Sequence, residues 1–442
     1  MSLLAAAAGT IAPEILTRDE VVALSDALLA EPDLAITRTE DVSRIAAAEL
    51  EWDIGAIRYE PADPARAAIG PDGRRIGFFL LHGGEDDYHV HEELALLMAR
   101  KRGFTVVNMT YPGRFYFGDR EHHWPGETFH ADGSVRTPIW LRGETIGRDE
   151  YDIIANDQYR DRYGVRSFAR ARPGTRFFDR MAAWPLAFEA AMLDLCRRHF
   201  PPDRYAIYAH GHSTGGPFTH ALLQRVENAA GICGIENSPF GCIWGEVNGR
   251  PWLGQFNDLM VRTWREIARY RGAEALLKRG PEALMSLPAL MEEVFEDWET
   301  AKAAPQFKAE SILHVNCVPA LTAAAEATAK RLKLSAAATA ELVARYLAYP
   351  LPLTGPGARP VPPLLFIYCA YSRDHTRANY LEKIVPGLLR IDPAPKIRLV
   401  EFGAGTHFYQ KPEAGLPKGC SPAALSLWHQ AISAGYFLPA DR

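Results

Sequence analysis

The sequence predicts an α/β protein whose sheet is mostly parallel and covered by helices on both faces. Short continuous apolar runs, typical of strands buried on two sides, alternate with helical segments along much of the chain. One of these runs, 205–210, leads through the pentapeptide Gly-His-Ser-Thr-Gly at 211–215 into a helical segment. A strand, a G-x-S-x-G turn and a helix in this order are typical of a nucleophile elbow, in which a strained turn exposes the Ser213 hydroxyl.

The remaining elements follow from apolar runs and from helix start and stop signals. Residues 17–48 are expected to be helical, and Trp52–Tyr59 alternates weakly like an outer strand. Gly103 is expected to end a helix in the left-handed conformation. Core strands are expected over 76–81, 104–110, 205–210, 231–236, 364–370 and 396–402, and core helices over 92–102, 184–199 and 218–226.

Two long insertions interrupt this core and set the expected domain boundaries. The first, 112–182, is rich in aromatic, histidine and arginine residues. The second, 245–350, is expected to contain several helices, such as 258–271, 289–301 and 335–348. The expected organisation is an N-terminal helical extension with an outer strand (1–60), the first part of the core (61–244), the helical insertion (245–350) and the second part of the core (351–442).

Composition excludes several classes of protein. Apolar residues make up 48% of the 442 residues and charged residues 23%, which is ordinary for a globular chain. The formal net charge of −5 offers no basic surface for nucleic acid, and no apolar run is long enough for a membrane span. The chain is expected to act on a small molecule, and self-association is left open.

The cysteines and the N-terminus indicate a reducing compartment. Six cysteines are scattered without C-x-x-C spacing, several of them in apolar segments where a free thiol acts as a small hydrophobe. The first ten residues lack a basic region, so a signal peptide is disfavoured. A cytoplasmic location is expected, with a periplasmic or secreted one as the alternative.

Candidate partners for Ser213 lie just after later strands. A serine hydroxyl needs a base to become a nucleophile, and His407 follows strand 396–402 on a Gly-rich loop. Asp374 follows strand 364–370 and Glu236 ends strand 231–236, so either carboxylate could orient the histidine. His210 and His212 flank Ser213 and are expected to pack or to hydrogen-bond locally.

In these motifs and in their order along the chain, the sequence resembles the α/β-hydrolase superfamily over about residues 74–244 and 360–434. The resemblance implies a triad of Ser213, His407 and Asp374, with Glu236 as the alternative acid, because family members most often place the acid on the loop that holds Asp374. It also implies a cap in the position of the second insertion.

The resemblance further implies an oxyanion hole made of two backbone N–H groups. One would come from Thr214, and the other from the loop after strand 76–81, with Gly84 favoured over Gly83 and Glu85. The loop begins His82-Gly83-Gly84 but departs from the family's HGGG form at Glu85, which puts in doubt membership of the esterases that accept tertiary-alcohol esters.

Other polar clusters give weaker signals. The ligand-rich stretch 85–93 lacks a paired motif such as H-E-x-x-H, so no metal site is expected there, and no phosphate-binding glycine loop is present. No metal or organic cofactor is therefore expected. The expected activity is hydrolysis of a carboxylic ester through an acyl-enzyme; an amidase or peptidase, a C–C hydrolase, an acyltransferase and a catalytically silent binding protein remain as alternatives.

Overall fold

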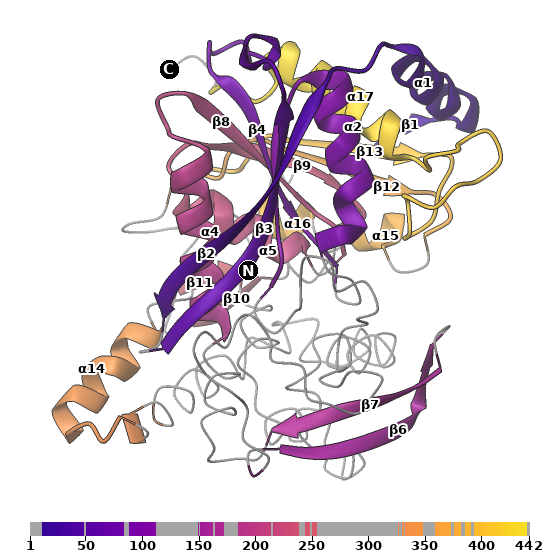
Figure 1. The fold of residues 1–442 in the computed structure, drawn as a ribbon. Helices are drawn as coiled ribbons and strands as arrows, with labels where there is room; N and C mark the ends of the chain where they lie inside the picture. Colours follow the sequence, from indigo (N-terminus) through magenta and orange to yellow (C-terminus); the bar gives the residue numbers. More distant parts are fainter. Residues whose placement is uncertain are drawn as a thin grey trace, which may run out of the picture.

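The computed structural model contains a nine-stranded central sheet with helices on its two faces (Figure 1). In spatial order the strands are β1 (Glu14–Leu16), β13 (Ile397–Phe402), β12 (Leu364–Cys369), β9 (Ala229–Ile235), β8 (Tyr205–Gly211), β4 (Arg75–Leu81), β5 (Thr105–Met109), β3 (Leu50–Pro61) and β2 (Ile36–Ala47). The structure describes residues 11–47, 50–83, 88–111, 149, 151–161, 164–171, 184–213, 215–237, 244–247, 250–253, 326, 329–330, 332–347, 359–372, 375–381, 385–389 and 393–439.

The strands from β1 to β5 run parallel to one another, whereas β3 and β2 are antiparallel additions beside β5. This order, with the G-x-S-x-G turn directly after β8, confirms the predicted α/β-hydrolase fold. The carboxyl ends of the parallel strands meet at one edge of the sheet, and the loops that leave this edge carry the candidate site residues.

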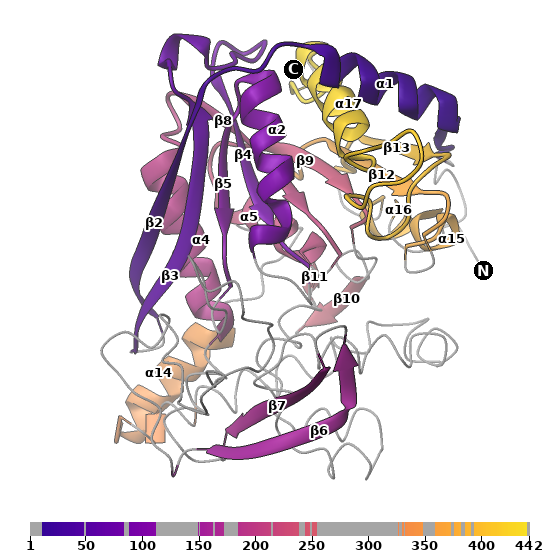
Figure 2. The same cartoon turned by 45° about the vertical axis from the view of Figure 1, so that its right-hand side comes forward.

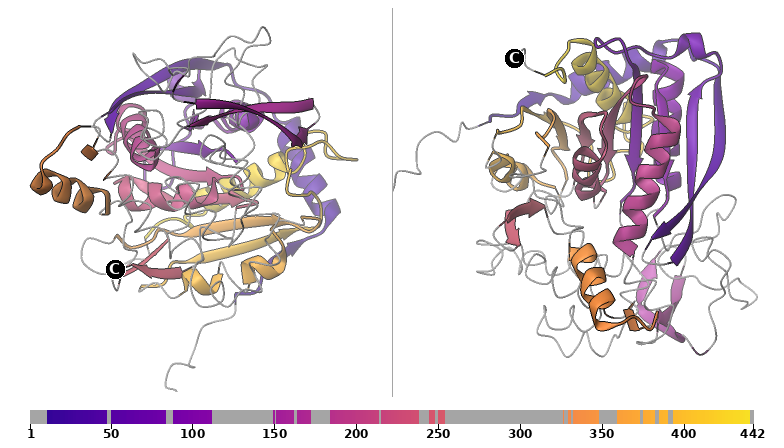
Figure 3. Two further views of the ribbon diagram at one scale, coloured as in Figure 1. Left: turned by 90° about the horizontal axis from the view of Figure 1, so that it is seen from below. Right: turned by 90° about the vertical axis from the view of Figure 1, so that its left-hand side faces the viewer.

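Helices cover both faces of the sheet. Figures 1 and 2 show α1 (Arg18–Ala30), α2 (Glu92–Arg102) and α17 (Ser421–Ser433) grouped together, away from α4 (Trp184–His199) and α5 (Gly216–Arg225). Figure 3 shows the same layers from two further directions. Among the described residues, no helix combines the length and the apolar character that a bilayer crossing requires.

Alternating side chains of the central strands supply the core between the sheet and the helices. On β4, the ring of Phe78 lies 5.2 Å from that of Phe104 and 6.0 Å from that of Trp428 on α17, measured between centroids. Trp428 is fully buried, as is Phe78. This aromatic cluster attaches the C-terminal helix to the middle of the sheet, and burial of such large apolar side chains stabilises the fold by roughly 1.5–3 kcal/mol each.

The predicted core elements are confirmed with shifts of one or two residues at their ends. Gly103 ends α2 in the left-handed conformation, with a φ of 64°, as expected. A Cβ at this position would lie 2.4 Å from the carbonyl oxygen of Arg66, so the close approach of backbone also requires glycine here.

The expected helix over 17–48 is wrong beyond Ala30. Thr17 caps α1 at its start, and the helix ends at Ala30, shortly before Pro32, which cannot donate a helical hydrogen bond. The chain then forms β2, which pairs with β3 from Ile36 opposite Pro61 to Ala47 opposite Leu50. Its β-branched residues and its partner strand outweigh the helical propensity of its charged residues.

The strand predicted over 52–59 is part of β3, but it is not the outer strand. β3 lies between β5 and β2 and is buried along almost its whole length, which explains why its alternation is weak. The described strands of the N-terminal segment 1–60, including β1, therefore belong to the central sheet.

Little of the two insertions falls within the described residues. The first contributes the hairpin of β6 (Tyr151–Asp161) and β7 (Gly164–Ala171). The second contributes the short hairpin of β10 (Trp244–Val247), which begins at its border, and β11 (Arg250–Leu253). It also contributes the helix α14 (Ala336–Leu347), which matches the stretch expected at 335–348. The helical stretches expected at 258–271 and 289–301 lie outside the described residues, as does most of the expected cap. The short helices α15 (Arg377–Asn379) and α16 (Val385–Leu388) follow β12.

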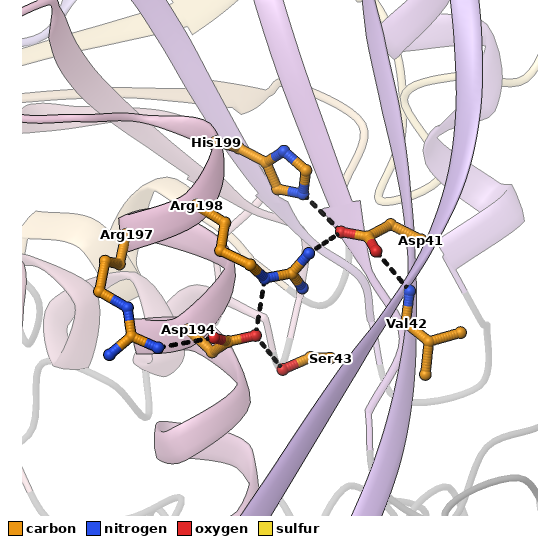
Figure 4. Close-up of polar contacts among 7 residues, drawn as sticks. All are labelled: Asp41, Val42, Ser43, Asp194, Arg197, Arg198 and His199. Carbon is orange, nitrogen blue, oxygen red and sulfur yellow. Dashed lines mark hydrogen bonds and ion pairs between the residues drawn. The ribbon is translucent and has the colours of Figure 1, made fainter.

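A polar network joins the edge strand β2 to helix α4 (Figure 4). The carboxylate of Asp41 accepts hydrogen bonds from Arg198 and, at 2.7 Å, from His199. Asp194 accepts a hydrogen bond of 2.8 Å from Ser43 Oγ. Burial disfavours the charge on Asp41, but the hydrogen bonds from His199 and Arg198 outweigh it and lower the pKa of Asp41.

The lowered pKa of Asp41 predicts a pH-dependent contribution to stability. A carboxylate with a lowered pKa in the folded state stabilises the fold above its ordinary pKa of about 3.9, and this contribution is lost as the pH falls through the folded-state value. Asp41→Asn should therefore lower the free energy of unfolding at pH 7 by up to about 1 kcal/mol. Thermal unfolding at pH 7 and near pH 3 should show the deficit shrinking at the lower pH, whereas Asp26→Asn, at an exposed position on α1, should show no deficit. An equal deficit at both pH values would contradict the role given to the Asp41 charge.

Candidate active site

The turn after β8 holds Ser213 in a strained conformation. Ser213 has a φ of 50°, in the left-handed region that costs a non-glycine residue about 1–3 kcal/mol. Its backbone N–H donates to the carbonyl oxygen of Glu236 at 2.7 Å, and its carbonyl oxygen accepts from Gly216 N at 2.9 Å. These two hydrogen bonds fix the turn between β9 and the start of α5.

Two glycines of the motif are required by close contacts between backbone segments. A Cβ at Gly211 would lie 2.2 Å from the carbonyl oxygen of Gly215, and a Cβ at Gly215 would lie 2.3 Å from that of Leu81. Both distances are far below a normal contact and involve backbone, which cannot rotate away. The structure thus explains the glycines at the first and last positions of the pentapeptide.

The loop after β4 lies directly against the turn that holds Ser213. A Cβ built on Gly83 would be 3.4 Å from Ser213 Cβ, so the backbone of Gly83 is adjacent to the serine. Tyr111, just after β5, donates a hydrogen bond of 2.7 Å to the carbonyl oxygen of His82 and stacks on the His82 ring at 3.6 Å between centroids. Thr214, Gly84 and Glu85, the other expected oxyanion-hole residues, lie outside the described residues.

The carboxylate that lies beside His407 is that of Glu236, directly after β9. His407 Nδ1 and Glu236 Oε2 are 3.2 Å apart, and the Glu236 side chain is fully buried. A carboxylate accepts, so Nδ1 carries the proton and Nε2 is left as the basic nitrogen. Asp374, the acid favoured from the sequence, lies outside the described residues.

The Glu236 carboxylate has two further hydrogen-bond donors. Its Oε1 accepts from the backbone N–H of Cys369 at 2.7 Å, and its Oε2 accepts from Ser372 Oγ at 2.7 Å. Burial raises the pKa of Glu236, while the hydrogen bonds from His407, Cys369 and Ser372 oppose the rise. Like Ser213, Glu236 has a positive φ, at 54°, so both residues are held in strained backbone.

His407 also contacts the residue that precedes Ser213. The ring of His212, the residue before Ser213, lies 4.7 Å from the ring of His407 between centroids. His212 Nε2 donates a hydrogen bond of 2.9 Å to the His407 carbonyl oxygen. The sequence indicated that His212 would pack or hydrogen-bond locally, whereas its hydrogen-bond partner is the backbone of His407, far away in the chain.

A group of buried histidines surrounds these residues. His91, His210, His212 and His375 are all at most 3% exposed. Burial lowers the pKa of His91 to about 4 and lowers the pKa values of His210, His212 and His375 well below the ordinary value. These four rings are therefore uncharged at neutral pH, so they add no positive charge beside His407.

Hydrogen bonds assign partners to two rings in this group. His91 Nε2 donates to the Leu81 carbonyl oxygen at 3.2 Å, and its Nδ1 accepts from the Gln410 amide at 3.2 Å. His210 Nε2 shares a hydrogen bond of 2.9 Å with the Tyr409 hydroxyl. Gln410 and Tyr409 follow His407 closely in sequence, so this group anchors the loop after β13 to the ends of β4 and β8.

Sequence reasoning missed the loop residues Ser372 and His375. Ser372 Oγ donates to Glu236 and accepts from the His375 backbone N–H at 3.1 Å. The His375 ring lies edge-on to the His407 ring at 4.6 Å between centroids. Both residues lie within two positions of Asp374, but no signal in the sequence indicated that this hydroxyl and this imidazole lie beside Glu236 and His407.

Proteins similar to this chain are found among solved structures. A scan against family models and a search of curated proteins gave no match. Among solved structures, the chain is similar to a bacterial heroin esterase (15% identity, TM-score 0.38, covering 95% of this chain and 90% of that one). It is also similar to a proline iminopeptidase-related protein from Thermus thermophilus (16% identity, TM-score 0.35, covering 90% of this chain and 99% of that one).

A third similar structure, an acylaminoacyl peptidase from Pyrococcus horikoshii, shows 11% identity and a TM-score of 0.37. The match covers 92% of this chain but only 42% of the peptidase chain, so this chain spans less than half of that protein's length. The fold assignment rests on the sheet order and on the turn at Ser213, and these similarities assign neither a substrate nor a reaction.

The contacts around the pentapeptide predict a large effect of Gly211→Ala. Because the new Cβ would overlap backbone, the turn must shift, and overpacking of this kind costs about 1–3 kcal/mol. Thermal unfolding and labelling of Ser213 by a fluorophosphonate probe should both be impaired. Gly77→Ala on β4 is a matched control, because its Cβ would meet the side chain of Phe200, at 2.7 Å, rather than backbone. An equal or greater loss of labelling in Gly77→Ala would contradict this account of the turn.

Proposed function

We propose that this chain is a serine hydrolase that cleaves carboxylic esters, with Ser213 as nucleophile, His407 as base and Glu236 as the acid that orients the base. The observation that carries the proposal is the contact between the buried Glu236 carboxylate and His407 Nδ1. Both residues lie on loops adjacent to the strained turn at Ser213. It replaces Asp374, favoured from the sequence, with the alternative that the sequence also offered.

In this mechanism each residue has one task. Ser213 Oγ attacks the ester carbonyl carbon while His407 Nε2 takes its proton, and the imidazolium then returns that proton to the departing alcohol. A water molecule, deprotonated by the same nitrogen, hydrolyses the acyl-enzyme. Glu236 fixes the Nδ1–H tautomer and stabilises the imidazolium, a task suited to a carboxylate that already accepts three hydrogen bonds.

The backbone around Ser213 is suited to stabilising the oxyanion. The positive end of α5 begins at Gly216, directly after the elbow, and favours negative charge near Ser213. Thr214 N–H and an N–H of the loop after β4, at Gly84 or its neighbours, are the proposed donors. The proximity of Gly83 to Ser213 supports this choice of loop.

The proposed nucleophile predicts a specific loss of activity. Ser213→Ala should lower kcat for p-nitrophenyl esters by about 10⁴–10⁶-fold, because only binding and oxyanion contributions remain. The variant should also fail to react with a fluorophosphonate probe. A panel of esters of different acyl length, with an anilide control, should separate esterase from amidase activity, and an acceptor alcohol should reveal acyl transfer. Stoichiometric phosphonylation at a residue other than Ser213, or a wild-type protein that binds esters without cleaving them, would contradict the proposal.

The proposed acid predicts an asymmetry between two amide variants. Glu236→Gln removes the charge beside His407 Nδ1 and allows the wrong tautomer, so kcat should fall by about 10⁴-fold. Asp374→Asn should cost about tenfold or less, as expected for a residue that supports the loop. Steady-state kinetics of both variants, with thermal unfolding as the check on folding, decides between the two carboxylates. A larger loss in Asp374→Asn would restore the acid favoured from the sequence.

A further inference from the structure

His375 is a buried imidazole that the proposed reaction does not use. It is fully buried, and among the residues that the structure describes neither of its ring nitrogens has a hydrogen-bond partner. A buried polar group without a partner costs about 1–3 kcal/mol, and such a group calls for an explanation in terms of a ligand, a water or a role. Its position edge-on to His407 places this imidazole beside the proposed triad.

His375, Glu236 and His407 together form a set of metal-ligand groups. One donor atom from each, an imidazole nitrogen or a carboxylate oxygen, lies within 4.8 Å of the other two. The three residues come from the loops after β12, β9 and β13, so three neighbouring strands of the sheet present them. Two imidazoles and one carboxylate with an open fourth position form a ligand set that Zn²⁺ accepts.

The distances fit a tetrahedral ion with a limited rearrangement. Bonds of about 2.0–2.1 Å in a tetrahedron place neighbouring ligand atoms about 3.3 Å apart. The 3.2 Å between His407 Nδ1 and Glu236 Oε2 already matches this edge. The ligand nitrogen of His375 must move by up to about 1.5 Å toward the other two ligand atoms. The ring loses no hydrogen bond to a described residue when it moves.

We propose that Glu236, His375 and His407 form a Zn²⁺ site whose occupation switches off the hydrolase. The ion bonds to His407 Nδ1 and to the Glu236 carboxylate in place of the hydrogen bond between them. The proton leaves Nδ1 and Nε2 takes one from solvent, so the ring stays neutral but Nε2 can no longer accept the proton of Ser213. The inhibition rests on the proposed function, whereas the binding of the ion does not.

Direct binding tests the site without reference to catalysis. Equilibrium dialysis with Zn²⁺, and visible absorption after loading with Co²⁺, should show one tetrahedral site in the wild type and in Ser213→Ala. His375→Phe, which keeps an aromatic ring but no ligand atom, should weaken Zn²⁺ binding by about tenfold or more. His375→Gln covers the case in which the Phe variant does not fold. The matched control is His429→Phe, because the His429 ring lies on α17 beside Phe104. The Zn²⁺ affinity of this variant should equal that of the wild type.

Activity and probe labelling then test the switch. Zn²⁺ should block fluorophosphonate labelling and ester hydrolysis in the wild type, and EDTA should restore both. In His375→Phe, measured against the metal-free rate of that variant, the same inhibition should need about tenfold more Zn²⁺.

No saturable Zn²⁺ binding, or equal Zn²⁺ affinity in wild type and His375→Phe, would overturn the site. A changed KM in His375→Phe with unchanged Zn²⁺ affinity would also overturn it and would place the ring against substrate. Normal Zn²⁺ binding in a protein that neither hydrolyses esters nor labels would leave the site standing and reject the proposed function instead.

Discussion

The site is organised around one buried carboxylate. Glu236 lies at the end of β9, and its two oxygens receive donors from the backbone at the end of β12, from Ser372 and from His407. Its own backbone carbonyl accepts the N–H of Ser213. A charge removed from water is tolerated only when several donors replace that water, so the loops from β8, β12 and β13 must converge on this residue for the fold to be stable. The same convergence of donors that offsets the cost of burying Glu236 places the loops that hold Ser213 and His407 beside each other.

The histidines around this carboxylate have a complementary effect. Four rings that could carry charge are kept neutral by burial, so the described charged group in contact with His407 is the Glu236 carboxylate. Their polar atoms instead attach backbone segments to one another, as His91 does at the carbonyl oxygen of Leu81 and His212 at that of His407. The hydrogen bonds that attach the loop after β13 to its neighbours are therefore uncharged, and they add no charge beside Glu236.

Much of the core could be predicted from the sequence because buried parallel strands have a strong local signature. The runs that became β4, β8, β12 and β13 are largely apolar, and the motif at 211–215 has a fixed relation to the strand and helix on either side. β2 was missed because its pattern of exposed charges is shared by surface helices, and only its pairing with β3 decides the matter. For the same reason the choice between Glu236 and Asp374 could not be made locally. Both follow strands at the same edge, and the contact between Glu236 and His407 joins residues that are far apart in the chain, so no window of sequence contains it.

The pairing of β1 with β13 has a consequence for how the chain acquires its structure. Glu14, Ile15 and Leu16 lie beside Val400, Glu401 and Phe402, so the first described strand borders the last. During synthesis β1 emerges hundreds of residues before its neighbour, and closing so long a loop carries an entropic cost that local contacts cannot offset. The backbone groups of β1 therefore cannot form their ladder hydrogen bonds until β13 has been made. The pairing of β1 with β13 is thus expected to form late in folding. Because β13 leads into the loop that holds His407, this part of the site is expected to be completed late as well.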